Sequence, residues 1–322
     1  MAKHWQQRRK RDWARKLAAQ KHQQRPQEFI LLDQFSAADI KKWKELQNRI
    51  LTLHWDYYCS LAYQRSKVQN DLQQALLYAA ERDFKFEKWQ RAVTYKYALK
   101  PLSLAGSLVD PGGRFNIGEI DTQRFPPFPA LYIACDKDTA LQELLCQKKD
   151  PGNEAHALEF ALLSPASIAS VSISGTLDSV INLNAPDQLV PFVEIFKNFS
   201  LPEHIQEESK EIGLGEQFII KTVSQLISGL LDPYWRAWPM NFDVPVASQI
   251  FGQMVLDAGI DGILYPSKFS GKDCLAIFPQ NFDYPEKSFV QLDDETPPDV
   301  KIKRLDVSSW ELERNELGGQ VG

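Results

Sequence analysis

From about residue 85 onward, short apolar runs typical of β-strands alternate with helical segments, and Pro and Gly residues separate them. Their order has no regular β-α-β rhythm, which a doubly wound parallel sheet would require. We therefore predict an α+β fold with a mixed or mainly antiparallel sheet. The chain has 322 residues, of which 43% are hydrophobic, and this is enough to bury a sizeable core.

The local patterns predict individual elements within this region. Strands are expected over residues 89–97, 130–135, 156–163, 168–173, 263–265 and 275–278. Helices are expected over residues 139–147, 216–231 and 248–258, and residues 190–199 fit either a strand or a short helix. Asp136 or Asp138 is placed to cap the first helix, and Gly259 is placed to end the last.

Residues 36–82 are predicted to be helical and to precede the sheet. Ser36 and Asp39 have the spacing of a capping box. Two apolar faces follow, with residues three and four apart: Ile40, Trp43, Leu46, Ile50, Leu53, Tyr57 and Leu61 in the first, and Leu72, Ala75, Leu76 and Ala79 in the second. Two such helices suggest an antiparallel hairpin. It is either a scaffold packed on the main domain or an element that binds a partner or blocks the site.

The distribution of charge distinguishes a third region at the N-terminus. Residues 1–25 hold nine Lys and Arg against the single acid Asp12, a charge of +8, so the rest of the chain carries −13 to give the total of −5. This tail is either a solvated, partly helical segment or an arm that touches nucleic acid or an acidic partner. The acidic remainder argues against nucleic-acid binding as the main function. The predicted domains are thus a basic tail (1–25), a helical extension (26–85) and a catalytic domain (86–322).

Several familiar kinds of site are missing from the sequence. It contains no GxxxxGK[ST], HExxH or GxSxG motif, and its five histidines do not cluster at metal-ligand spacing, so no metal is expected. No apolar run is long enough to cross a membrane, and no apolar core follows the basic N-terminus. We expect a cytoplasmic protein whose chemistry relies on Arg, Glu, Tyr, Ser and Asn.

The segment Gly112–Gly118 presents an arginine in a glycine-rich turn. Glycines let the main chain approach a ligand closely, and the planar guanidinium of Arg114 suits two phosphate oxygens. Alternatively, Arg114 pairs with a structural carboxylate. Asn116 either donates to a ribose or caps the turn.

A tyrosine and a glutamate follow within thirty residues. Tyr132, in the apolar run 130–135, is either a core residue or a plate that stacks on a flat base and attracts a cationic nicotinamide. Glu143, in the predicted helix 139–147, either interacts with the helix dipole or holds a ribose hydroxyl and stabilises an oxocarbenium-like transition state.

The order of these features resembles the RES domain, a family named for Arg, Glu and Ser. The resemblance rests on Gly112-Gly113-Arg114-Phe115-Asn116, then Ala130–Ala134 with Tyr132, then Thr139–Glu143. A second block, Pro245–Gly252 followed by Gly262–Ser267, is also similar, and Arg91 matches an arginine on the family's first strand. The resemblance spans roughly residues 88–280.

The resemblance implies a fold similar to ADP-ribosyltransferases and a toxin that destroys NAD⁺ under the control of an Xre-like antitoxin. It implies that Arg114 and Arg91 hold the pyrophosphate or orient the ribose, that Tyr132 lines the nicotinamide pocket and that Glu143 stabilises the ribosyl cation. Further contacts would come from Ser248, Gln249 and Ser267. The acceptor would be water, phosphate or a protein, and a binding protein without turnover is the alternative from another functional class.

Overall fold

The computed structural model describes residues 37–146, 168–215, 217 and 219–318. The chain divides into two compact units, residues 1–50 and 51–322, and the description below concerns the second. The basic tail and the predicted strand 156–163 lie outside the described residues, so the tail and its suggested partners stay predictions.

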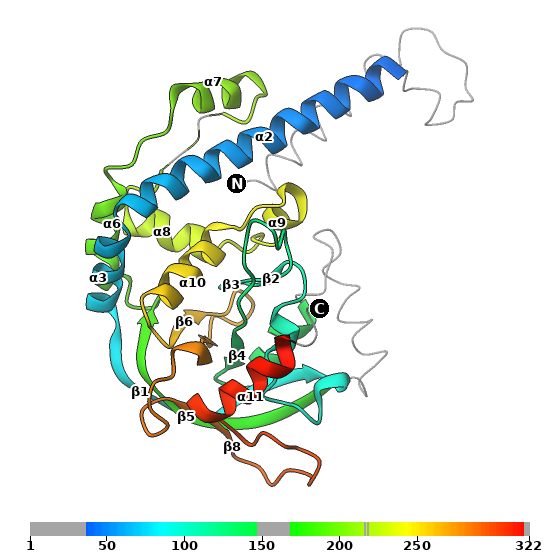
Figure 1. The fold of residues 1–322 in the computed structure, drawn as a ribbon, viewed down its shortest axis with the longest axis vertical. Helices are drawn as coiled ribbons and strands as arrows, with labels where there is room; N and C mark the ends of the chain where they lie inside the picture. The colour runs from blue at the N-terminus through cyan, green and yellow to red at the C-terminus, as the bar shows by residue number, and fades with distance from the viewer. Residues whose placement is uncertain (1–36, 147–167, 216, 218, 319–322) are drawn as a thin grey trace. The chain divides into compact units, whose positions relative to one another are not determined.

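Two helices precede the sheet, as predicted. Helix α2 (Ala37–Lys67) spans both units, and α3 (Gln69–Ala79) follows after Val68. Helix α3 buries the four residues of its predicted apolar face, and it packs on α6 (Val190–Phe196) and α10 (Ala247–Asp257). A link of one residue is too short to reverse the chain, so α3 turns away from the end of α2 into the core and the predicted antiparallel hairpin is not formed (Figure 1).

Seven strands of the described residues form one sheet in the order β1-β4-β7-β6-β5-β8-β9. They are β1 (Glu81–Thr94), β4 (Leu131–Ala134), β5 (Ile168–Asn182), β6 (Gly262–Pro266), β7 (Asp273–Ile277), β8 (Phe289–Leu292) and β9 (Arg304–Leu305). The pairs are antiparallel except for β5 with β6, which confirms the predicted mixed, mainly antiparallel sheet. Because β1 also pairs with β5, five strands close into a ring.

The remaining helices include one that was predicted well and several that were not. Helix α10 agrees with the predicted 248–258, and residues 190–199 contain the helix α6. Helix α8 (Val223–Leu230) begins seven residues later than predicted, because Thr222 accepts a hydrogen bond from the Gln225 amide and caps it there. The unpredicted elements include α7 (Glu203–Glu211), α9 (Ala237–Phe242), α11 (Val307–Gly318), β8 and β9.

Strand β1 is longer than predicted, and its sequence explains why. The prediction placed a strand at residues 89–97, whereas β1 begins at Glu81, ends at Thr94 and is followed by a 3₁₀ turn. Phe84 and Phe86 alternate with charged residues there, a pattern typical of a half-buried strand. Asp83 and Lys88 adopt positive φ angles of 55° and 57°, which interrupt that alternation.

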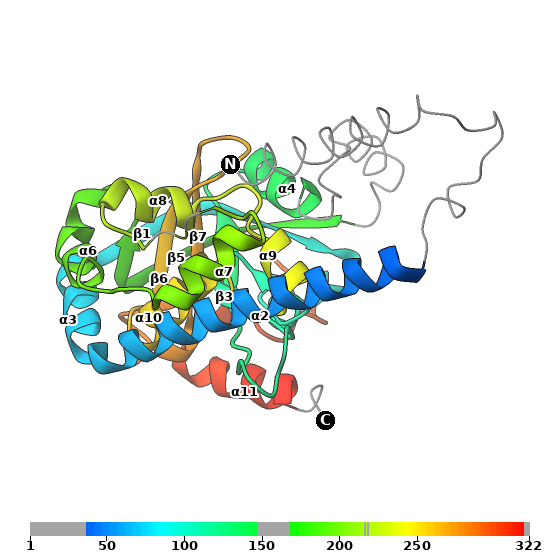
Figure 2. The same ribbon diagram turned by 90° about the horizontal axis from the view of Figure 1, so that it is seen from above.

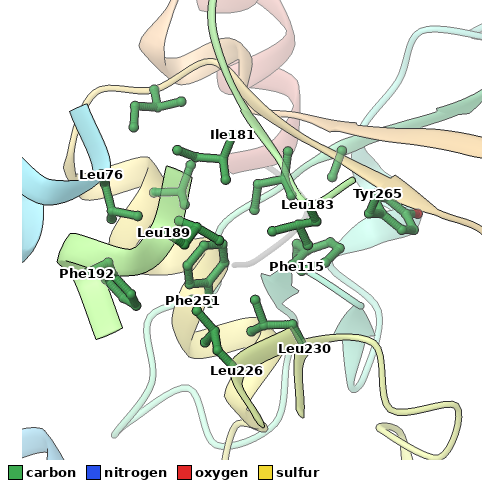
Figure 3. Close-up of a cluster of buried hydrophobic side chains, with 14 of the residues drawn as sticks. Leu76, Phe115, Ile181, Leu183, Leu189, Phe192, Leu226, Leu230, Phe251 and Tyr265 are labelled. Atoms are coloured by element: carbon green, nitrogen blue, oxygen red, sulfur yellow. The ribbon is translucent and has the colours of Figure 1, made fainter. Parts of the chain in front are cut away.

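The sheet separates two hydrophobic cores, and alternate residues of each strand face one or the other. Tyr132 of β4 and Tyr265 of β6 pack in the first core with α3, α6, α8 and α10, whereas Leu131 and Ile133 pack in the second with α11. Figure 3 shows the first core, in which Phe115 and Tyr265 lie together on one side of the cluster. Figure 2 gives a second view of these helices and of α11. The candidate site lies at the border of the first core.

His54 of α2 is buried among aromatic rings of α9. Its ring lies 4.7 Å from that of Trp238 and 3.9 Å from that of Phe242, and it is 6% exposed. Burial lowers the pKa of His54 from 6.5 to about 4, because the charged imidazole loses its water. The side chain is therefore neutral at pH 7.

This burial predicts a pH dependence that one substitution removes. Between pH 7 and pH 5 we expect wild type to lose about 2 kcal/mol of unfolding free energy relative to His54→Phe, because in this range the unfolded chain binds a proton that the folded one does not. The contribution is complete above pH 6.5 and is lost as the pH falls toward 4. Urea denaturation at both pH values measures it.

Asp261 has the opposite effect on the pH dependence of stability. Burial raises its pKa to about 6, so the free energy of unfolding rises as that carboxylate is protonated. Asp261 is present in both proteins, so its effect cancels in the comparison. An identical pH dependence of the two proteins would show that His54 is not the group responsible.

Candidate active site

The arginine turn is a hairpin of two very short strands. In β2 (Gly112–Gly113) and β3 (Asn116–Ile117), Gly113 pairs with Asn116, which leaves Arg114 and Phe115 at the tip. Gly112 has a φ of 95°, and a Cβ there would lie 2.4 Å from the main-chain nitrogen of Gly118. Only glycine fits this position, which explains the glycine-rich sequence.

Asn116 and Gln249 fasten the hairpin to α10. Asn116 accepts a hydrogen bond from the Gly113 amide at 2.9 Å and donates to the carbonyls of Ser107 and Phe128 at 2.7 and 2.9 Å. Gln249 donates from Nε2 to the carbonyls of Pro111 and Asn116 at 2.7 and 3.1 Å. Both side chains are fully buried. For Asn116 this geometry favours the alternative that it caps the turn.

Tyr132 supports the same hairpin from β4. Its hydroxyl donates to Asn116 Oδ1 at 2.9 Å and accepts from the Phe115 amide at 3.0 Å. A Cβ at Gly113 would lie 2.3 Å from this hydroxyl, so the glycine makes room for the ring. Burial raises the pKa of Tyr132, which therefore keeps its proton.

Glu143 and Ser267 come from segments far apart in the chain. Helix α4 (Lys137–Cys146) begins at Asp136, whose Oδ1 accepts from the Thr139 amide at 2.8 Å, so this predicted cap is confirmed. Glu143 lies one turn further and accepts from Ser267 Oγ at 2.6 Å. Ser267 is 4% exposed and Glu143 is half-buried. The pair is a carboxylate held by a hydroxyl, with one oxygen engaged by Ser267.

Arg114 is buried beside this pair. It is 6% exposed, and its Nη1 donates to the carbonyl oxygens of Leu230 at 3.2 Å and Asp232 at 2.9 Å. Burial lowers its pKa, while the charges of Tyr265, Glu143 and Tyr132 raise it. The partners that fix the guanidinium are neutral carbonyls, so its charge is not cancelled by a direct ion pair within the described residues.

Two further groups surround the cluster. Trp235 is buried, and its ring centre lies 4.7 Å from the guanidinium of Arg236 and 5.8 Å from that of Arg114. Arg236 interacts electrostatically with Tyr132, Arg114 and Glu143, and burial lowers its pKa. Tyr265 packs edge-on against Phe115 at 4.9 Å. The cluster therefore combines two arginines, two tyrosines and one carboxylate.

Arg91 lies elsewhere, on the side of the sheet that faces α11. It donates to the main-chain carbonyls of Ser103 at 2.6 Å and Tyr132 at 3.4 Å. Burial lowers its pKa to about 10, and the buried carboxylate of Glu313 opposes that shift. Arg91 thus contacts the main chain of Tyr132, while the Tyr132 side chain belongs to the cluster on the opposite face.

Among the described residues, no group of three or more His, Cys, Asp or Glu side chains is arranged to hold a metal ion. In the same parts of the chain, no helix is both long and apolar enough to span a membrane.

A comparison with known protein families gives a match, and it covers part of this cluster. Residues 218–298 match the RES domain. The match confirms the resemblance noted in the sequence, over a range that includes Ser248, Gln249 and Ser267. Arg91, Arg114, Tyr132 and Glu143 precede the matched range, and the structure is what brings the last three of them next to Ser267.

The chain was also compared with curated proteins and with solved structures. No curated protein matches the chain. Among solved structures, the chain is similar to one in the crystal structure of the M. tuberculosis MbcT-MbcA toxin-antitoxin complex, with 17% sequence identity and a TM-score of 0.41. That alignment covers 76% of this chain and 97% of the other.

Sequence reasoning missed Tyr265 and Arg236, which both lie within the range of the RES match. Tyr265 precedes Ser267 by two positions, and strand alternation could have placed both on one face. Arg236 follows Trp235 between α8 and α9, in a segment without a motif, so the sequence held no comparable signal. Ser248 is fully buried in the first turn of α10, next to Gln249.

Proposed function

We propose that this protein is an NAD⁺-degrading toxin that cleaves the bond between nicotinamide and ribose. The observation that carries the proposal is the pair of Glu143 and Ser267 beside the buried Arg114, with Tyr132 next to them. The RES match supports the family assignment. A fold like that of ADP-ribosyltransferases and a reaction as a glycohydrolase or phosphorylase are the finer parts of this proposal.

The chemistry needs no metal or strong acid. When the bond from C1′ of the ribose to the pyridinium nitrogen breaks, its electron pair goes to that nitrogen, and nicotinamide leaves as a neutral molecule. The ribose is left as an oxocarbenium-like cation, to which water or phosphate then adds at C1′. A carboxylate fixed beside C1′ stabilises the positive charge as it develops.

Each residue of the cluster has a proposed part in this reaction. Glu143 stabilises the ribosyl cation, and the hydroxyl of Ser267 holds the carboxylate in place. Arg114 and Arg236 supply positive charge for the diphosphate, and their position beside Trp235 keeps water away and strengthens the attraction. Tyr132 lines the nicotinamide pocket while its hydroxyl holds the hairpin.

The other predicted residues are proposed to position the site. The side-chain amides of Asn116 and Gln249 donate hydrogen bonds to main-chain carbonyls in and around the hairpin, and Arg91 donates to the main-chain carbonyl of Tyr132. We therefore propose that these three residues act on NAD⁺ indirectly, by holding Arg114 and Tyr132 in position. Ser248 stays a candidate contact because no hydrogen-bond partner of its buried hydroxyl lies among the described residues.

The proposal extends to partners and location. A toxin of this kind needs a restraint, and we propose an Xre-like antitoxin because the RES resemblance implies one. Its substrate is cytoplasmic, so we propose that the protein acts there. Nucleic acid or an acidic protein as partner of residues 1–25 remains a prediction from charge alone.

The proposal predicts that the purified full chain releases one nicotinamide for each NAD⁺ consumed. Chromatography of the products identifies the acceptor: ADP-ribose indicates water, a phosphorylated ADP-ribose indicates inorganic phosphate, and modified protein found by mass spectrometry indicates a protein ADP-ribosyltransferase. NAD⁺ that binds and is recovered intact would instead favour a binding protein without turnover.

A further inference from the structure

A cavity of about 290 Å³ lies on the helical side of the second unit, and neither Glu143 nor Ser267 lines it. The second half of α2 and helices α6, α8, α9 and α10 surround it. Its apolar wall includes Phe192, Phe196, Leu226, Leu230, Phe251 and Met254. Figure 3 shows Phe192, Leu226, Leu230 and Phe251 converging in this region of the core. The volume lies at the lower end of the range of small-molecule pockets.

Among the described residues, Arg65 and Asp232 are the two charged residues at the wall of this apolar space, and Arg65 is its cation. Arg65 of α2 lines the cavity, and its guanidinium carbon lies 5.6 Å from the ring centre of Tyr58. Burial lowers its pKa, and the groups that oppose this shift are the hydroxyls of Tyr57 and Tyr58. These are neutral partners, and no carboxylate of the described residues is among the charges that act on Arg65.

The other polar groups at the cavity do not supply that balance. His54 is neutral at pH 7 because of its lowered pKa. The charge of Asp232 is not among those that act on Arg65; its carboxylate accepts from the Tyr234 main-chain amide at 2.8 Å, and its carbonyl accepts from Arg114. An apolar cavity with a cation at the Arg65 end, away from the influence of Asp232, suits a ligand that has one negative charge and a hydrocarbon body.

We propose that this cavity binds a medium-chain fatty carboxylate, with the alkyl chain against the apolar wall and the carboxylate on Arg65. A nucleotide fits less well, because its several polar groups and charges would be buried among Phe and Leu side chains without partners. A neutral hydrocarbon would leave Arg65 unbalanced.

The cavity shares part of its wall with the proposed active site. Leu230 and Asp232 line the cavity, and their carbonyl oxygens are the two that hold Arg114. An occupant that presses on this segment moves the acceptors of the arginine. We therefore expect the fatty carboxylate to change the affinity for NAD⁺, and this second part rests on the proposed function.

Calorimetric titration of the full chain with octanoate tests the site without any need for activity. We expect saturable binding, weakened at least tenfold by Arg65→Gln, while binding of uncharged 1-octanol stays unchanged in that variant. Arg82→Gln is the matched control, since Arg82 is an exposed arginine of β1 paired with Asp178. Thermal denaturation checks that each variant is folded.

A second variant blocks the cavity and does not depend on Arg65. Gly229 lines the cavity, and a Cβ at this position would meet nothing within 4 Å, so Gly229→Leu adds bulk at little cost to folding. We expect it to abolish binding of both octanoate and octanol. Absence of octanoate binding to wild type, equal binding to Arg65→Gln, or simple competition by NAD⁺ would each overturn the proposal. An inactive wild type that still binds octanoate through Arg65 would refute only the proposed function.

Discussion

Replacing Glu143 by Gln is expected to lower the rate of NAD⁺ cleavage by about a hundredfold to a thousandfold, which is typical for removal of one group that stabilises transition-state charge. The amide keeps the size of the carboxylate and can still accept from Ser267 Oγ, so the fold should survive. What is lost is the negative charge beside the developing ribosyl cation. The effect should fall on kcat, with KM for NAD⁺ changed much less, because the ground state carries less charge at C1′.

The matched control for this variant is Asp138→Asn. Asp138 lies in the first turn of the same helix, α4, and is exposed. The substitution therefore removes a carboxylate from the helix without changing the cluster. Nicotinamide release over a range of NAD⁺ concentrations gives kcat and KM for all three proteins. Wild-type turnover in Glu143→Gln would rule out the proposed role of Glu143, whatever the products are.

Replacing Gly252 by Ala is expected to destabilise the protein by about 3 kcal/mol, the upper end of what overpacking usually costs. A Cβ at this position of α10 would lie 1.9 Å from the main-chain oxygen of Phe115. A main-chain atom cannot rotate away as a side chain can, so either the helix or the hairpin tip must move. Because the tip carries Arg114, we expect weaker NAD⁺ binding as well as a lower urea midpoint.

Gly229→Ala is the control for this substitution. It is also a glycine inside a helix, α8, and its added Cβ would touch nothing within 4 Å. Alanine is there expected to stabilise the protein by about 0.5–1 kcal/mol, because glycine is a poor helix former. The two variants should therefore shift the urea midpoint in opposite directions. A midpoint of Gly252→Ala at or above that of wild type would mean that the contact of α10 with the hairpin is not tight.

The sequence allowed the fold class and several elements to be predicted, because they depend on local patterns. Leu72, Ala75, Leu76 and Ala79 were predicted as one face of a helix, and α3 buries all four. Pairings between distant segments could not be predicted in the same way. The ring of five strands depends on contacts of β1 with both β4 and β5, for which no turn or short loop fixes the register.

The candidate site was predictable in part for the same reason. Arg114, Tyr132 and Glu143 lie within thirty residues, and their order was sufficient to suggest a cluster. The position of Arg91 could not be foreseen, because the side of the sheet that a strand residue faces depends on register, and the bulge after Phe86 changes it. Arg236 was missed because its role comes from packing on Trp235 and not from a spacing.

The distances along the chain between bonded residues have a consequence for protein synthesis. Arg114 and the carbonyl of Asp232 are 118 residues apart, and Glu143 and Ser267 are 124 apart. During synthesis, Arg114 and Glu143 therefore leave the ribosome well before the groups that hold them. The proposed toxin would become able to attack NAD⁺ only after Ser267 and strand β7, which joins β4 to β6, have left the exit tunnel. Chains terminated earlier would be harmless to the cell that makes them, and an antitoxin would need to recognise only the finished protein.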